Sequence, residues 1–104
     1  MAELPPGVER IRKIEAGRPR VDWPFVEHVV QFTYGTGEEE VVLANIGANG
    51  PLPIPAAGQV VRLHDAYVRV VFVGVSYGAT ADGAPIVHAL ARVESAEAPA
   101  GSVP

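Results

Sequence analysis

Three histidines, His28, His64 and His88, are the side chains of this sequence best suited to acid–base or metal chemistry. They lie far apart in the chain and lack the close spacing of a local metal site, such as H-x3-H or HExxH. His28 and His88 each fall on the apolar alternation of a predicted strand. If those strands met, the two imidazoles could approach, share a metal or sense pH. We expect instead that each is partly buried and hydrogen-bonded to backbone.

Other catalytic patterns are missing from the sequence. It has no cysteine, so thiolate nucleophiles and thiolate metal sites are excluded. His64 and Asp65 share a turn with no nucleophile nearby, and Ser76 lies within a predicted strand without a G-x-S-x-G elbow. The glycine segments "GANG" and "GATADG" match neither phosphate-binding pattern. We therefore expect a protein that is not an enzyme and has no cofactor and no metal site.

Charge is unevenly distributed along the 104 residues, whose formal net charge is −4. Residues 1–20 contain five cations and three carboxylates, a balance of +2, so the remaining residues sum to −6. The cations are Arg10, Arg12, Lys13, Arg18 and Arg20. An acidic body disfavours binding to nucleic acid, because neutralising phosphates requires clustered cations. The basic segment is either an arm for an acidic partner or a solvated terminus.

The length fits one domain, which we divide into a helical, basic arm (1–20), a β-barrel (21–94) and a disordered tail (95–104). In the arm, Val8, Ile11 and Ile14 recur three residues apart, on one face of a short helix. Pro5 and Pro6 precede this helix, and Gly17 followed by Pro19 ends it. Such a short helix is unstable alone in water and must dock on something or fray.

From residue 25 onwards the apolar period changes to two, which predicts strands. We expect strands over 25–34, 38–46, 59–63, 67–77 and 86–94. The first two form a hairpin around Thr36, with Val30 opposite Val42, because this register aligns their apolar faces. Strand 67–77 is apolar on both faces and should be central and covered on both sides, with a bend or bulge at Gly74. Five bent antiparallel strands are most simply closed into a small barrel, which removes exposed edges.

Between the second and third strands lies "GANGPLPIPAAG" (47–58), where glycine and proline rule out a strand. Its prolines fix the backbone and lower the entropy lost on folding. Pro51, Pro53 and Pro55 are two residues apart, whereas PxxP ligands need a spacing of three. We expect this loop to serve the fold rather than a ligand.

The stretches "PIPAAGQVVRL", "AYVRVVFVGVSY" and "IVHALARV", within residues 53–93, resemble a pattern of small SH3-like β-barrel proteins of bacteria and their phages. That resemblance implies an SH3-like barrel, and such proteins often act as adaptors without an active site. A helix followed by five bent strands is also similar in outline to the Sm-like fold, whose members often bind RNA as rings. The sequence contains no Sm motif.

Aromatic residues are the main candidates for partner contacts. Trp23 and Phe25 flank Pro24 before the first strand, and Tyr67 and Tyr77 lie at the two ends of the fourth. SH3-like surfaces bind ligands through such clusters of aromatics and proline. In the alternative, which we favour, Trp23 and Phe25 plug the open end of the barrel beneath the helix. The candidate partner-binding residues are Trp23, Phe25, Tyr67, Tyr77, Arg10, Arg12, Arg18 and Arg20.

These observations favour a non-enzymatic interaction or assembly module, an adaptor that binds another protein or its own copies as an oligomer. One alternative is a small barrel that binds nucleic acid, possibly as a ring, and another is a histidine-dependent or metal-binding enzyme. The start "MAELPPGVERIRK" has no apolar core and the longest apolar run is too short for a bilayer, so we expect a soluble, cytoplasmic protein. Arginine in excess of lysine suggests a GC-rich bacterial genome.

Overall fold

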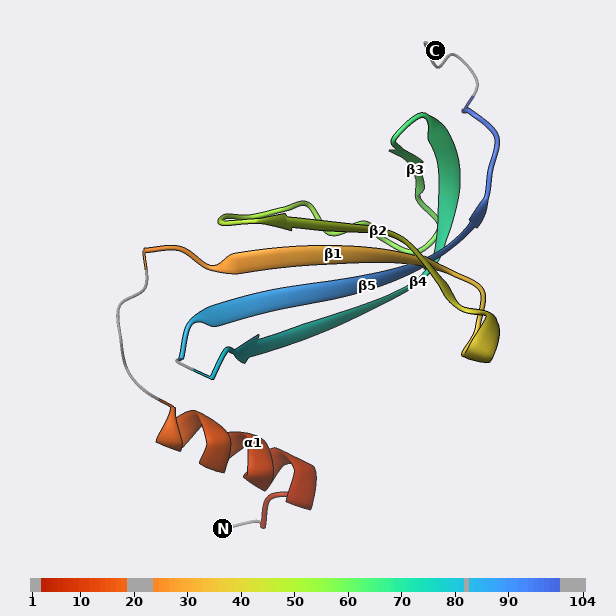
Figure 1. Cartoon of the computed structure of the whole chain (residues 1–104). Coiled ribbons are helices and arrows are strands. Elements are labelled where there is room, and N and C mark those ends of the chain that lie inside the picture. Colours follow the sequence, from red (N-terminus) through yellow and green to blue (C-terminus); the bar gives the residue numbers. More distant parts are fainter. Residues whose placement is uncertain (1–2, 19–23, 82, 100–104) are drawn as a thin grey trace.

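A computed structural model describes residues 3–18, 24–81 and 83–99. The described chain is mainly β, with one short helix and a five-stranded sheet that forms a half-barrel (Figure 1). The elements are α1 (Pro6–Gly17), β1 (Glu27–Tyr34), the 3-10 turn η1 (Gly37–Glu39), β2 (Val41–Ala48), β3 (Val60–Leu63), β4 (Ala66–Ala79) and β5 (Pro85–Ser95). No helix among the described residues is long and apolar enough to cross a membrane.

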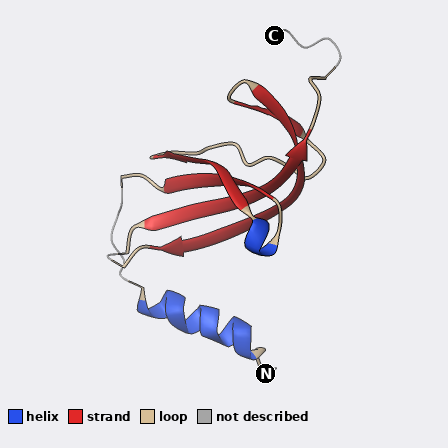
Figure 2. Ribbon diagram, turned by 45° about the vertical axis from the view of Figure 1, so that its right-hand side comes forward, coloured by secondary structure: helices blue, strands red, loops and turns tan. Residues whose placement is uncertain are grey.

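The strands form a mixed sheet in the order β2-β1-β5-β4-β3, in which β1 and β5 run parallel and all other pairs antiparallel. The prediction of an all-antiparallel closed barrel is therefore wrong in two respects. Successive strands alternate in direction, so the first and fifth run the same way and their contact must be parallel. Among the described residues β2 and β3 do not pair with each other, and the sheet stays open between them (Figures 1 and 2).

The β1–β2 hairpin forms as predicted, but in a different register. Val30 lies opposite Ile46 rather than Val42, a shift of 46 − 42 = 4 residues. Two features cause the shift: η1 lengthens the turn, and the register changes by one residue between Phe32 and Thr33. Before that irregularity the shift is even, so the apolar faces of β1 and β2 still coincide.

The core lies on one face of β1, β5 and β4. Val30 and Phe32 of β1 pair with Ala89 and Ala91 of β5, which are fully buried. The buried apolar residues are Val30, Phe32, Val68, Val70, Ala89, Ala91 and Val93, with Leu52, Val61 and Leu63 among those packed against them. The loop before β3 is fixed to this core, because the Gly58 N–H donates to the Val70 carbonyl oxygen at 2.7 Å.

Strand β4 departs most from the prediction. It has β5 along one side, but β3 pairs with it only over Ala66–Arg69, and the predicted cover on both faces is wrong. The bulge lies between Val70 and Phe72, not at the predicted Gly74. Gly74 instead leaves room for the Phe72 ring, which would lie 3.4 Å from a Cβ at that position.

Helix α1 has the predicted limits to within one residue, since Pro6, expected to precede it, is its first residue and Gly17 its last. It does not cover the sheet, since no Cα atom of α1 lies within 8 Å of a strand Cα among the described residues. At the other terminus, β5 continues to Ser95, and the Ala96 N–H donates to the Tyr67 carbonyl oxygen at 3.2 Å. Residues 97–99 belong to no helix or strand, and the rest of the predicted tail lies outside the described residues.

Substitution of Val70 by alanine should destabilise the protein, because its fully buried side chain cannot be replaced without a cavity. We expect the free energy of unfolding to fall by about 2 kcal/mol. The neighbouring Val71→Ala is the matched control, since Val71 is 44% exposed and should cost no more than about 0.5 kcal/mol. Urea titrations monitored by circular dichroism measure both, and equal losses would contradict the core described here.

The β1–β2 turn provides a second test. Gly35 has φ 85° and a Cβ there would lie 2.7 Å from the Glu39 carbonyl oxygen, whereas Gly37 has φ 62° with nothing within 4 Å. We expect Gly35→Ala to lower the free energy of unfolding by about 2 kcal/mol or more, and Gly37→Ala by about 1 kcal/mol. The same urea titrations show which of the two variants loses more free energy of unfolding. A larger loss for Gly37→Ala would show that the turn has another geometry.

Candidate protein-interaction site

The face that forms the core continues beyond the core and becomes exposed. Paired residues on neighbouring strands point to the same side of a sheet, so β1, β5 and β4 contribute rows of three side chains. The row Val30–Ala89–Val75 is buried at Val30 and Ala89, but Val75 is 39% exposed. In the next row, His28–Val87–Tyr77, none is buried and Tyr77 is 77% exposed. The core face thus ends in uncovered apolar surface.

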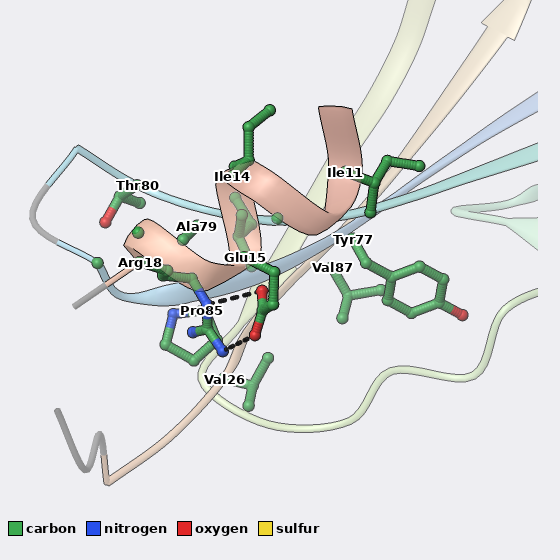
Figure 3. Close-up of a pocket in the computed structure, with 14 residues that line it drawn as sticks. Ile11, Ile14, Glu15, Arg18, Val26, Tyr77, Ala79, Thr80, Pro85 and Val87 are labelled. Carbon is green, nitrogen blue, oxygen red and sulfur yellow. Dashed lines mark hydrogen bonds and ion pairs between the residues drawn. The ribbon is translucent and has the colours of Figure 1, made fainter. Parts of the chain in front are cut away.

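Helix α1 lies across from this surface and leaves an open cleft of about 660 Å³ between them (Figure 3). The helix presents Ile11 and Ile14 to the cleft, and the sheet presents mainly Val26, Val87 and Tyr77. Ile11 and Ile14 line the cleft but are 68% and 62% exposed, so the apolar stripe of the helix is not packed on the sheet. Both walls of the cleft are mainly apolar, and they are accessible.

Two of the four described cations of the arm, Arg12 and Arg18, are paired with carboxylates of α1. Arg18 donates to the Glu15 carboxylate at 3.0 and 2.8 Å at the edge of the cleft, and Arg12 donates to Glu9 at 3.0 Å. The hydrogen bond from Arg18 to Glu15, and then the carboxylate charge, raise the pKa of Arg18 above its ordinary value. Arg10 is exposed and forms no ion pair with the described residues, and Arg20 lies outside them. Neither Arg12 nor Arg18 is thus a free cation for a partner.

The predicted aromatic contacts are distributed along the sheet. Tyr77 lines the cleft, and Phe25, 44% exposed, directly precedes the cleft residue Val26. Tyr67 is half-buried at the opposite end of β4, beside Arg62 of β3. Trp23 lies outside the described residues. Of the three candidate aromatics among the described residues, only Tyr77 lines the cleft.

The strands that carry His28 and His88 are neighbours, but the two side chains do not meet. Strands β1 and β5 are neighbours, but His28 pairs with Val87 while His88 pairs with Val29, so the two imidazoles point to opposite faces. His64 is exposed in the β3–β4 turn with φ 57°. Within the described part of the chain no group of three or more His, Cys, Asp or Glu residues could hold a metal ion. The geometry therefore offers no shared histidine site.

Sequence reasoning did not find a polar pair on the opposite face of the sheet. Thr33 of β1 is fully buried opposite Arg92 of β5, and the guanidinium of Arg92 lies over the Phe72 ring, 5.4 Å from its centroid. The Thr33 hydroxyl and the Arg92 Nε are buried without a hydrogen-bond partner among the described residues. The alternation of β1 predicts the side of Thr33, but not its burial.

No protein-family model matches this chain, and neither the curated proteins nor the solved structures searched contain a match to it.

The unpaired Thr33 hydroxyl generates a prediction about stability. Thr33→Val replaces this hydroxyl with a methyl group of similar size, so the desolvation cost of an unsatisfied polar group disappears. We expect the free energy of unfolding to rise by about 1 kcal/mol. Thr33→Ser is the matched control, since it retains the hydroxyl, loses the methyl and should destabilise. A destabilised Thr33→Val variant in urea titrations would show that the hydroxyl has a partner.

Proposed function

We propose that this protein is a non-enzymatic assembly module, an adaptor that binds another protein or its own copies. The observation that carries the proposal is the uncovered row ending in Tyr77, facing the exposed stripe of α1 across the cleft. Exposed apolar surface of this kind is unusual on a protein that acts alone, and it commonly marks an interaction site. A partner that fills the cleft removes both walls from water.

The composition of the cleft supports a protein partner. Its walls are mainly apolar, with one aromatic residue that is almost fully accessible, and the Arg18 guanidinium at its edge is already bound to Glu15. Tyrosine is enriched among residues that dominate binding energy at interfaces. Phosphate recognition would instead call for free cations converging on one surface. The histidines, on opposite faces, give no support to a shared catalytic site.

The resemblance to SH3-like barrel proteins of bacteria and phages supports the same role, since such proteins often serve as adaptors. The five strongly curved strands of the half-barrel fit that resemblance at the level of architecture. On this proposal the protein acts in the bacterial cytoplasm, with Tyr77, Ile11 and Ile14 as its central contacts. Phe25 and Arg10 lie outside the lining of the cleft and would form the rim.

The proposal predicts that capture of the partner depends on Tyr77. Tagged protein is incubated with nuclease-treated lysate of its host, together with a differently tagged copy of itself, and bound chains are quantified by mass spectrometry. Tyr77→Ala should reduce recovery of the stoichiometric partner by about tenfold or more, because a central tyrosine is lost. Its free energy of unfolding should change by no more than about 0.5 kcal/mol, because the side chain is exposed.

Tyr34→Ala is the matched control, because Tyr34 is also an exposed tyrosine at a strand end but lies outside the cleft. This variant should capture the partner as the unmodified protein does. Equal loss in both variants, or no stoichiometric protein captured by the unmodified chain, would contradict the proposed function.

A further inference from the structure

One edge of the sheet has little of the protection that normally prevents strands from associating, its one such feature being the bulge between Val70 and Phe72. Beyond Val70, strand β4 pairs with β5 only, and its other side is an open edge over residues 71–79. The sequence of this edge, "VFVGVSYGA", contains no charged residue and no proline. Proteins usually protect a free edge with lysine, proline, a bulge or a covering loop, because unpaired backbone groups there can join another chain.

The other edges of the same molecule are protected. Strand β3 is four residues long and carries Arg62. Strand β2 follows Glu38, Glu39 and Glu40, and the proline-containing segment 49–59 returns alongside it (Figures 1 and 2). Strand β2 itself also lacks charge and proline, so the segment that runs beside it is what distinguishes its edge from that of β4. An open backbone edge can be completed only by another extended strand, which defines the chemistry of the partner.

We propose that the partner strand is β4 of a second copy of this chain, paired antiparallel about a two-fold axis at Val75. This inference rests on the proposed function and names the partner. A two-fold axis perpendicular to the sheet keeps the faces of the two sheets aligned, so residue pairs must have numbers that sum to an even value. Centring the axis on Val75 makes that sum 150. The two apolar faces then become continuous.

In this register the side chains are complementary. On the core side, Val73 lies opposite Tyr77 of the second copy, and the two Val75 side chains meet. On the other side, Phe72 lies opposite Gly78 of the second copy, where no side chain obstructs the ring. Aromatic and β-branched pairs stabilise neighbouring antiparallel strands, and no like charges meet across the axis. A strand from an unrelated protein would not carry side chains that complement those of β4 in this way.

Helix α1 adds area to the same contact. It lies on the side of β4 away from β5 (Figures 1 and 2), and Tyr77, Gly78 and Ala79 line the cleft below its apolar stripe. A strand added at this edge would border the cleft, whose lining comes from α1, β4 and β5. Two paired strands alone form a small interface, whereas stable dimers bury about 1,200 Å² or more. Ile11 and Ile14 of both copies enlarge the buried surface.

The absence of cysteine from the chain allows a direct test of the register. Single-cysteine variants Val75→Cys, Tyr77→Cys and Val42→Cys are prepared in the full chain and exposed to a mild oxidant. Val75→Cys should form a covalent dimer rapidly, because the two cysteines face each other at the axis. Tyr77→Cys should not, because its cysteines would be about 13 Å apart along the strands, beyond the reach of a disulfide. Val42→Cys reports on the β2 edge and should also remain uncrosslinked.

Charge substitutions test the same axis without oxidation. Val75→Lys and Val75→Glu each place like charges together at the two-fold axis, so each variant should sediment as a monomer where the unmodified chain sediments as a dimer. An equimolar mixture of the two should restore a dimer containing one of each. Val42→Lys, also at an exposed apolar position, is the matched control and should remain dimeric. Circular dichroism confirms that each variant is folded.

The outcomes separate this inference from the proposed function. A monomeric unmodified chain at its highest soluble concentration, or faster crosslinking at Val42 than at Val75, would overturn pairing through β4. If that monomer still captured a different protein in a Tyr77-dependent way, the proposed function would stand and the strand would come from elsewhere. If it captured neither itself nor another protein, both proposals would fail.

Discussion

The fold depends on the close contact of β5 with β1 on one side and β4 on the other. This contact is possible because β5 presents Ala89 and Ala91 to the core face, both fully buried. An alanine leaves space for larger neighbours in the same row, so Phe32 from β1 and Val73 from β4 can lie on either side of Ala91. Larger residues at these two positions would overpack the centre of the sheet. Close packing at the centre of the sheet thus depends on two small side chains of its middle strand, Ala89 and Ala91.

The sheet does not close among the described residues, because β2 and β3 do not pair. Once β5 has joined β1 in parallel, the open ends of the sheet are β2 and β3, which segment 49–59 connects without pairing them. The core is therefore complete only at the end where β3, Leu52 and the bulged part of β4 curve over it. Toward Tyr77 the same face has no cover from strands, and α1 remains separated from it by the cleft. An uncovered core face is thus a direct consequence of the topology.

Local features were predictable from the sequence, and long-range features were not. The limits of α1 follow from Pro5 and Gly17, and the five strands follow from alternation, because both depend on neighbouring residues. The register of β1 with β2 depended on η1 and on a bulge after Phe32, neither of which alternation reports. Parallel pairing of β1 with β5 joins segments about sixty residues apart, and only the direction of each strand constrains it.

The candidate site shows the same division. Tyr77 was identified from its residue type, and the stripe of Ile11 and Ile14 from its spacing, but their meeting across one cleft is a tertiary property. The opposite orientation of His28 and His88 required the exact pairing, since a shift of one residue would have placed both on one face. The two apolar faces of β4 suggested a central, covered strand. They are equally compatible with a strand whose cover comes from another chain.

The uncovered apolar surface connects the stability of the protein with its assembly. In a single chain the stripe of α1 and the row ending in Tyr77 contribute little to folding, because both stay in contact with water. When a partner covers them, their burial stabilises the folded state by an amount that depends on partner concentration. A charge on β4 would make the isolated domain more soluble, and it would weaken the stabilisation that the folded state gains from its partner. The chain places charge or proline near its other edges and neither on this one, which is the pattern expected if selection retained association at the expense of an independently stable monomer.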